Sequence, residues 1–199
     1  MRRDGWWPEL HLNPIYRNRP DDQNMAFALD KGFGALTVSG QPYPLVAHVP
    51  FMPCQGGIEF HLLRSNPVAR AVPAQAVLIV AGPEGYVSPD WYGMADQVPT
   101  WNYVAVHLRG RLQPVDDLPG HLDRLSAHFE QRLLPKPPWS LAKTDAQALA
   151  RMMRMILPFR LLVDQIDGTW KFSQNKPDKA RLAAADHVAP DLAALMRRG

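Results

Sequence analysis

The stretch that most constrains this chain is residues 82–103, where four aromatic residues alternate with prolines and short polar side chains. It is flanked by the apolar runs 76–80 and 104–108, which are short, rich in β-branched residues and bounded by Gly or Pro, and so predict core strands. The aromatic residues are Tyr86, Trp91, Trp101 and Tyr103. A connection of this kind either plugs the end of a core or lines a pocket for a flat molecule. Both interpretations stay open from the residues alone.

Other strands are expected at regular spacing along the first two thirds of the chain. Residues 34–38 and 45–49 flank a Ser-Gly-Gln-Pro connection typical of a hairpin, residues 58–63 follow a Gly-Gly turn, and a long strand begins at Trp101 and ends near residue 112. Five or six short strands with turns between them indicate an antiparallel barrel or sandwich. The 20 prolines and 13 glycines argue against a helical bundle.

The periodicity changes after residue 115. An apolar stripe predicts a helix over 116–134, and a capping box at Thr144 predicts a second helix over 144–157. Residues 159–166 and 169–173 again resemble strands, with Asp167-Gly168 as the hairpin turn between them. The tail from 178 to 198 is alanine-rich and predicts helix interrupted at Pro190.

Composition limits the class of protein. A chain of 199 residues fits one large domain or a domain with a helical appendage. The net charge of +3, without a basic stripe or a helix-turn-helix pattern, argues against direct DNA binding. Cys54 is the only cysteine, which excludes an intrachain disulfide. No apolar leader or membrane-spanning run occurs, so we expect a cytoplasmic protein without membrane contact.

Histidines are the first candidates for chemistry. His121 and His128 are seven residues apart on one predicted helix, too far apart to bind one ion directly, and we expect both at the surface. His48, His61 and His107 sit inside predicted strands, where a buried histidine bonded to a backbone carbonyl is the simpler explanation. His61 differs because Arg64-Ser65-Asn66 follows it, and a guanidinium with a hydroxyl at a strand end suits a phosphate or carboxylate.

A second polar cluster lies at residues 171–176. Lys171 and Ser173 share one face of the predicted strand and could hold an anion, although a solvated charge explains Lys171 almost as well. The sequence contains no GxGxxG, P-loop, GxSxG or HExxH motif, so the common nucleotide, hydrolase and metalloprotease signatures are absent. No base is evident beside a nucleophile, and no catalytic residue is assigned.

Taken together, these motifs resemble the PaiB family, which is named for FMN-binding negative transcriptional regulators. The blocks that carry the resemblance span residues 12 to 185 and occur in order: His-Val-Pro-Phe at 48–51, His-Leu-Leu-Arg-Ser-Asn-Pro at 61–67, Ser-Pro-Asp-Trp-Tyr at 88–92, Pro-Thr-Trp-Asn-Tyr at 99–103 and Lys-Phe-Ser-Gln-Asn at 171–175. The resemblance implies a mainly β, α+β fold with flanking helices, a split β-barrel of the FMN-binding type. It also implies a homodimer with the cofactor between subunits, and it favours the pocket interpretation of the aromatic stretch.

On this resemblance the cofactor is FMN, and its contacts are expected from two groups of residues. The phosphate would lie near Arg64, Ser65, Lys171 or Ser173, and the ring near Trp91, Trp101 or Tyr103. The full expected set is His61, Arg64, Ser65, Asn66, Trp91, Trp101, Asn102, Tyr103, Lys171, Ser173 and Gln174. We expect an irregular arm at 1–22, a split-barrel domain at 23–176 and a helical tail at 177–199.

The resemblance also implies an alternative cofactor. Some proteins similar to PaiB are haem-dependent piperazate synthases that form an N–N bond, and their axial histidine falls in the block that matches His61. Two departures from the family pattern bear on the pocket. Phe60 replaces the usual glycine before the histidine and is expected to narrow the space beside it, and the amino-terminal arm is longer and carries Trp6-Trp7.

Three functions therefore stand beside one another. The first is a dimeric flavoprotein or flavin-binding regulator. The second is a haem enzyme with His61 as axial ligand. The third is a regulator that acts without a cofactor. In all three, Trp101 is expected in the core or in a pocket wall, where its loss to alanine would cost roughly 3–5 kcal/mol.

Overall fold

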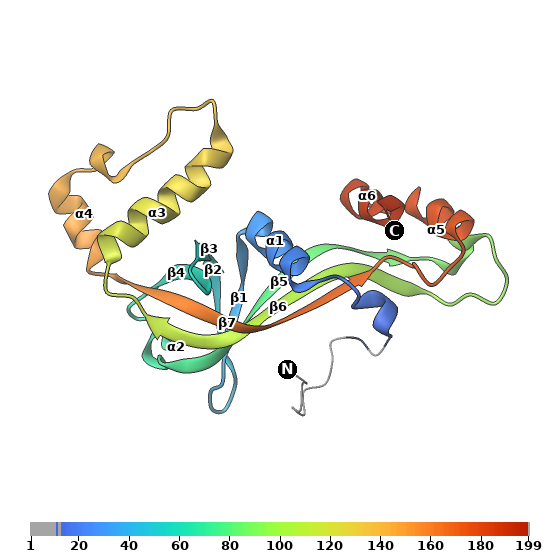
Figure 1. The fold of residues 1–199 in the computed structure, drawn as a ribbon, viewed down its shortest axis with the longest axis horizontal. Helices are drawn as coiled ribbons and strands as arrows, with labels where there is room; N and C mark the ends of the chain where they lie inside the picture. The colour runs from blue at the N-terminus through green and yellow to red at the C-terminus, as the bar shows by residue number, and fades with distance from the viewer. Residues whose placement is uncertain (1–10, 12, 199) are drawn as a thin grey trace. The chain divides into compact units, whose positions relative to one another are not determined.

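The computed structural model describes residue 11 and residues 13–198, and it is mainly β (Figure 1). The predicted arm residues Trp6 and Trp7 lie outside the described part. The strands are β1 (Phe33–Val38), β2 (Leu45–Pro50), β3 (Met52–Cys54), β4 (Gly57–Leu63), β5 (Ala74–Val87), β6 (Thr100–Pro114) and β7 (Ile156–Lys171). The expected mainly β architecture with flanking helices is confirmed.

The helices lie at the start, between β6 and β7, and at the end of the chain. They are η1 (Pro14–Tyr16), α1 (Asp21–Lys31), α2 (Pro67–Arg70), η2 (Pro89–Tyr92), α3 (Leu118–Glu130), η3 (Gln131–Leu133), η4 (Leu141–Lys143), α4 (Ala146–Met153), α5 (Asp178–Ala185) and α6 (Pro190–Arg198). Asp117 caps α3 by accepting from the Gly120 N–H, and Asp145 caps α4 by accepting from the Ala148 N–H. The tail forms two helices, and the second begins at Pro190, where the sequence predicts the interruption.

The seven strands form one sheet in the order β2-β1-β5-β6-β7-β4-β3. β1 pairs antiparallel with β2 and β5, and β4 pairs antiparallel with β3 and β7. Along β6 the burial alternates, with Asn102, Val104, Val106 and Leu108 buried and the residues between them at least partly exposed. The alternation follows from the two-residue period of a strand and decides which side chains of the aromatic stretch face the core.

The chain divides into two compact units that are interleaved in sequence. Unit 1 contains the described parts of Met1–Met25, Ala81–Val106 and Asp167–Gly199, and unit 2 contains Ala26–Val80 and His107–Ile166. The core of unit 1 includes Tyr16, Val87, Tyr92, Val104, Trp170, Phe172, Leu192 and Met196. The core of unit 2 includes Leu36, Val49, Phe51, Ile58, Phe60, Leu78, Leu108, Leu112 and Leu161. Each large side chain buried in this way contributes roughly 1.5–3 kcal/mol.

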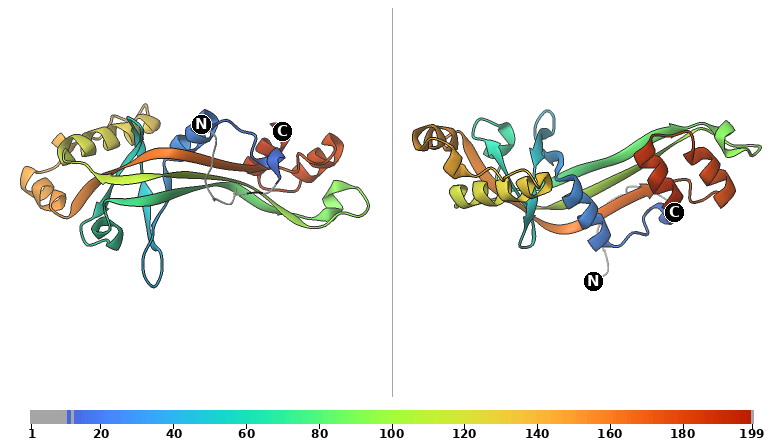
Figure 2. Two further views of the ribbon diagram at one scale, coloured as in Figure 1. Left: turned by 60° about the horizontal axis from the view of Figure 1, so that its bottom comes forward. Right: turned by 90° about the horizontal axis from the view of Figure 1, so that it is seen from above.

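Within each unit, helices pack on one another or on neighbouring segments. In unit 1, α5 contacts α6 and η2, and Figures 1 and 2 show the two tail helices side by side. In unit 2, α3 contacts β4. The helix α3 therefore delivers its side chains to β4, the strand that carries His61.

Two glycines of unit 2 allow β7 to lie close to its neighbours. A Cβ at Gly57 on β4 would lie 2.0 Å from the Leu161 carbonyl oxygen, and one at Gly110 on β6 would lie 1.9 Å from the Leu162 carbonyl oxygen. Real Cβ contacts are never this short, so neither position has room for a side chain.

The predicted hairpin at Asp167-Gly168 is wrong. β7 runs without interruption from Ile156 to Lys171, and Gly168 is not among the residues with positive φ that a two-residue hairpin turn requires. A Cβ at Gly168 would lie 2.0 Å from the Asn24 side-chain oxygen, so this glycine makes room for Asn24. That oxygen also accepts a hydrogen bond of 2.7 Å from the Trp170 indole nitrogen.

The strand before the aromatic stretch is longer than the sequence predicts. β5 continues to Val87, so Tyr86 is a strand residue. β6 begins at Thr100, so Trp101 and Tyr103 lie in a strand as predicted, and of the four aromatic residues only Trp91 lies in the connection, within η2. Among the described residues, no helix has the length and apolar character that crossing a membrane requires.

Candidate functional site

The predicted site residues form two groups, one in each unit. Unit 1 holds Trp91, Trp101, Asn102, Tyr103, Lys171, Ser173 and Gln174, and unit 2 holds His61, Arg64, Ser65 and Asn66.

Unit 1 contains a cavity of about 230 Å³, which we call the lysine pocket. Its lining residues are His11, Tyr16, Tyr92, Val98, Thr100, Lys171, Ser173, Asn175 and Lys176. Two of the predicted residues, Lys171 and Ser173, are brought together here. The lining residues that the structure describes include hydroxyl groups and two ammonium groups but no Asp or Glu, so the pocket is suited to an anion.

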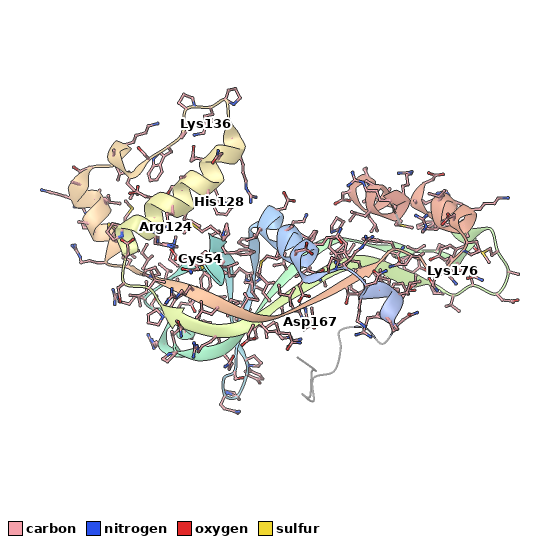
Figure 3. The ribbon with its side chains drawn as sticks, in the orientation of Figure 1. Cys54, Arg124, His128, Lys136, Asp167 and Lys176 are labelled. Atoms are coloured by element: carbon pink, nitrogen blue, oxygen red, sulfur yellow. The ribbon has the colours of Figure 1, made fainter. Side chains whose placement is uncertain are left out.

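The two lysines of the pocket have neutral neighbours. Lys171 Nζ donates to Thr100 Oγ1 over 2.6 Å and lies 5.9 Å from the centre of the Tyr16 ring. Lys176 Nζ donates to Gln97 and lies 5.5 Å from the centre of the Tyr92 ring. Neither lysine forms an ion pair with any described residue. Partial burial destabilises the charged form of Lys171 and lowers its pKa. An anion bound in the pocket would stabilise the charged form again. Figure 3 labels Lys176, which follows the end of β7.

Ser173 is held in an unusual conformation by buried polar groups. Its φ is +62°, in the left-handed region that non-glycine residues seldom adopt. Its hydroxyl lies 2.7 Å from the Tyr92 hydroxyl and accepts from the Asn102 side-chain nitrogen over 2.9 Å. Asn102 is fully buried, so it acts on the pocket through Ser173. Such a constrained residue is typical of a binding site.

Gln174 has a structural role at the same turn. Its side-chain oxygen accepts from the Phe172 N–H over 2.7 Å, and its side-chain nitrogen donates to the carbonyls of Trp170 and Ile15. These bonds tie the end of β7 to the segment that contains Tyr16. Gln174 is absent from the pocket lining.

The aromatic residues of unit 1 are arranged in three ways. Trp91 is partly buried and stacks on His187, with ring centres 5.2 Å apart. Trp101 is 51% exposed and meets Tyr86 edge to face at 6.5 Å. The core placement expected for Trp101 is therefore wrong, because β6 turns this side chain away from the buried face that Asn102 shares with Val104. Tyr103 is partly exposed.

Unit 2 contains a chain of three side chains, which we call the histidine relay: Glu59, His121 and His61. Glu59 and His61 lie two residues apart on one face of β4, and His121 reaches them from α3. His121 Nδ1 lies 2.8 Å from Glu59 Oε1, and His121 Nε2 lies 3.0 Å from His61 Nδ1. Arg124, labelled in Figure 3, donates to Glu59 Oε1 over 2.9 Å.

The surroundings of the relay determine its protonation. Burial alone would raise the pKa of Glu59, but hydrogen bonds from His121 and Arg124 outweigh burial and lower it. Burial lowers the pKa of His121 and of His61. At neutral pH the carboxylate is therefore ionised and both imidazoles are neutral.

His121 corrects the expectation of a surface histidine. It is fully buried, whereas His128 is partly exposed. The signal was present in the sequence, because His121, Leu125 and Phe129 step by four and lie on one face of the helix. Of the other candidates, His48 is exposed and stacks on Phe33 at 6.2 Å, and His107 is partly exposed.

The polar residues after His61 form a turn. Asn66 caps α2 by accepting from the Val68 N–H over 2.9 Å, so its side-chain oxygen is used within the fold. Arg64 and Ser65 are exposed, and Arg64 Nε donates to the Arg154 carbonyl over 3.1 Å. The remaining nitrogens of Arg64 form no hydrogen bond with a described residue.

Phe60 does not narrow the space beside His61. It is fully buried on the opposite face of β4 and lies 6.4 Å from the Phe159 ring. Its substitution for the glycine usual in the family therefore adds to the core and leaves the face of His61 unchanged. Among the described residues, no group of three or more His, Cys, Asp or Glu side chains could hold a metal ion by itself.

Comparison with solved structures identifies the fold. The "Flavocytochrome Anf3" from Azotobacter vinelandii matches with a TM-score of 0.57 and 16% identity over 77% of this chain and 68% of its own. The "FAD and Heme binding protein" from Mycobacterium smegmatis matches with a TM-score of 0.56 and 17% identity over 86% and 79%. These matches show the fold, the split barrel that the resemblance to PaiB implies.

The family follows from the sequence comparisons. The chain belongs to the family described as "Putative FMN-binding domain", whose model matches residues 10–165. The "Protease synthase and sporulation protein PAI 2" of Bacillus subtilis is 28% identical over 158 residues, 75% of each chain. An uncharacterized protein of Aspergillus fumigatus is 23% identical over 83% of this chain and 85% of its own. The expected resemblance to PaiB is confirmed.

Proposed function

We propose that this chain binds FMN with the phosphate end of the cofactor in the lysine pocket. The observation that carries the proposal is the pair Lys171 and Lys176. Within the described part of the chain these two ammonium groups have no ion pair, and no carboxylate lines their pocket. A flavin supplies one-electron and two-electron redox chemistry when bound. The chain's own residues would bind and orient it.

The donor set of the pocket fits a phosphate. Lys171 and Lys176 provide two positive charges, and Thr100, Tyr16 and Tyr92 provide hydroxyl groups. Charge-assisted hydrogen bonds of this kind contribute roughly 1.5–3 kcal/mol each. The cavity of about 230 Å³ is smaller than the roughly 300–1,000 Å³ of pockets that enclose whole ligands. We therefore assign it to the phosphate and not to the ring.

The flavin ring would contact the aromatic residues of unit 1. Trp101 and Tyr86 are both about half exposed, which leaves a flat apolar surface for a ring to cover. In the proposed assembly a second copy of the chain completes the site, so the cofactor lies between two subunits. Light scattering of the purified protein should give the mass of a dimer. A monomer at micromolar concentration that still binds FMN would refute the shared site.

Titration of the apoprotein with FMN and with riboflavin tests the phosphate site. Lys171→Ala and Lys176→Ala should each weaken FMN binding by about one to two orders of magnitude, because each substitution removes one charge-assisted contact to the phosphate. Riboflavin lacks the phosphate, so its affinity should stay unchanged. Lys179→Ala is the matched control, because Lys179 is exposed on α5 and absent from the pocket lining.

The same titration with Arg64→Ala separates the two predicted phosphate sites. Arg64 is exposed in unit 2 and could offer its free guanidinium nitrogens to a phosphate. A selective loss of FMN affinity in Arg64→Ala, with Lys171→Ala and Lys176→Ala unchanged, would move the phosphate to the turn after His61. Equal losses for FMN and riboflavin would mean that a variant disturbs the fold.

A second function, haem binding through His61, is favoured by the histidine relay. His61 is partly exposed, and its Nε2 makes no hydrogen bond with a described residue, while Nδ1 is bonded to His121. Histidine ligands of metals commonly bond their other ring nitrogen in this way. A haem-loaded protein would be red and would lose its Soret band in His61→Ala, whereas a flavoprotein would be yellow.

The third alternative is a regulatory role without a bound cofactor. The resemblance to PaiB-type regulators supports regulation, and the net charge of +3 gives little support for direct DNA binding. A colourless protein that takes up neither FMN nor haemin would favour this third function over the first two.

A further inference from the structure

The relay in unit 2 fixes more than the position of His61. The three side chains are joined end to end: Glu59 Oε1 to His121 Nδ1 at 2.8 Å, and His121 Nε2 to His61 Nδ1 at 3.0 Å. Glu59 and His121 are buried, and His61 is partly exposed. The relay therefore leads from a buried carboxylate to a ring nitrogen near the surface.

Counting protons along the relay assigns each ring nitrogen. The ionised Glu59 carboxylate can only accept, so His121 must carry its proton on Nδ1. A neutral His121 then has a lone pair on Nε2, which can only accept. His61 must donate from Nδ1, and its own Nε2 is left with a lone pair. The opposite arrangement would need either a doubly protonated His121 in a fully buried position or a neutral Glu59 beside the Arg124 guanidinium, which favours the ionised carboxylate.

We propose that His121 and Glu59 are positioning residues that hold the proton of His61 on Nδ1 and present its Nε2 lone pair as a ligand for haem iron. This inference rests on the second proposed function, haem binding. Neither residue would touch the iron. Their contribution would be to fix the tautomer and the ring orientation of His61 before the ligand arrives.

A packing role alone does not explain the relay. Burying a carboxylate is unfavourable, and an apolar side chain at position 59 would fill β4 without that penalty. A histidine that only fills space needs one backbone carbonyl as a partner. Here His121 is bonded on both ring nitrogens, and the second bond goes to the one relay member that is partly exposed.

The tautomer can be measured on the apoprotein by NMR of ¹⁵N-histidine-labelled samples, which shows which ring nitrogen carries the proton. We expect the His61 proton on Nδ1 in the parent protein. His121→Leu removes the acceptor, and His61 should become a mixture of both tautomers. His121→Gln can still accept from His61 and donate to Glu59, so it should restore the Nδ1–H form. A parent protein with the His61 proton on Nε2 would overturn the proposal.

Haemin titration gives the second readout on the same variants. Loss of a partner behind a metal ligand commonly weakens metal binding by about 10–100-fold, which is the loss expected in His121→Leu, with partial recovery in His121→Gln. Equal haemin affinity in parent and His121→Leu would overturn the positioning role. Haemin uptake that survives in His61→Ala would instead refute the haem site itself, while the tautomer measurement would still stand. His128→Leu, on the same helix but outside the relay, is the control for an effect of α3 as a whole.

Discussion

In unit 1 two lysines face a polar pocket whose described lining residues include no carboxylate, whereas in unit 2 a carboxylate lies buried with its hydrogen-bond partners in place. The lysine pocket holds two partly buried cations that have no counter-ion among the described residues, and a bound anion would stabilise this arrangement. The relay is complete within the chain and directs one ring nitrogen outward. The comparison separates two cations without an ion-pair partner among the described residues from a carboxylate whose partners are already in place.

The largest difference between the units should appear when one charge is removed from each. Glu59→Ala leaves the buried His121 Nδ1–H unsatisfied, and such a loss costs roughly 1–3 kcal/mol of unfolding free energy. Lys171→Met removes a cation whose partial burial is unfavourable, so stability at pH 7 should stay within about 0.5 kcal/mol of the parent or rise. Urea unfolding of both variants measures the difference. Glu59→Gln keeps a hydrogen-bond acceptor for His121, so it should lose less unfolding free energy than Glu59→Ala. Equal stability of Glu59→Ala, Glu59→Gln and Lys171→Met would contradict the expected difference between the two units.

A smaller difference is expected in the dependence of stability on pH. The pKa values of His61 and His121 are lowered from 6.5 in the folded chain, so below about pH 6.5 the unfolded chain binds more protons and stability falls. The pKa of Glu59 is lowered from 4.5, and its contribution is lost at still lower pH as the folded carboxylate becomes protonated. Each group contributes at most about 1.4 kcal/mol per pH unit.

Unfolding at pH 7, 6 and 5 tests this acid sensitivity. His121→Gln removes one titrating group and should show a shallower fall than the parent. Lys171→Met should keep the parent's slope, because a lysine stays protonated across this window. If the slope is unchanged in His121→Gln, protonation of His121 does not contribute to the loss of stability at low pH, and the prediction is wrong.

The smallest effect is expected at Trp101. Its side chain is 51% exposed, so Trp101→Ala should lower the free energy of unfolding by only about 1 kcal/mol. This loss comes from the edge-to-face contact with Tyr86 and from the part of the ring that is buried. Thermal unfolding of the FMN-free protein measures it. A loss of several kcal/mol would show that another surface, such as a second subunit, buries this ring. Phe172→Ala, from the fully buried interior of unit 1, is the reference for a core loss of roughly 3–5 kcal/mol.

Much of the fold could be predicted because short apolar runs and turn residues recur along the chain. The strands at 34–38, 45–49 and 58–63 and both inserted helices were found at their places within a few residues. The prediction of a hairpin at Asp167-Gly168 is wrong because a glycine in the sequence indicates either a turn or a place where a distant side chain approaches the backbone, and the sequence does not distinguish the two. Here the glycine gives space to the Asn24 side chain, which is 144 residues away from it in sequence.

The candidate sites were predicted only in part. The sequence places Lys171, Ser173 and Lys176 in one polar cluster but does not indicate Tyr16, Tyr92 and Thr100, which reach the pocket from three other segments. Sequence reasoning found His61 and missed its partners, because the pairing of β4 with α3 is a tertiary contact. Trp101 could have been placed correctly, since the alternation of Asn102, Val104 and Val106 already puts it on the other face of the strand.

The close approach of β7 to its neighbours has a consequence for any survey of tolerated substitutions. Gly57 and Gly110 have no room for even a methyl group, because a backbone carbonyl lies 2.0 Å or less from the position a Cβ would occupy. Replacement of either by any other residue would force two strands apart, so both positions would rank among the most sensitive in the chain. Neither carries a functional group. At these two positions intolerance of substitution reports a lack of space and not a functional role. Functional residues are better identified by conservative exchanges, such as His121→Gln or Glu59→Gln, that change a measurable property.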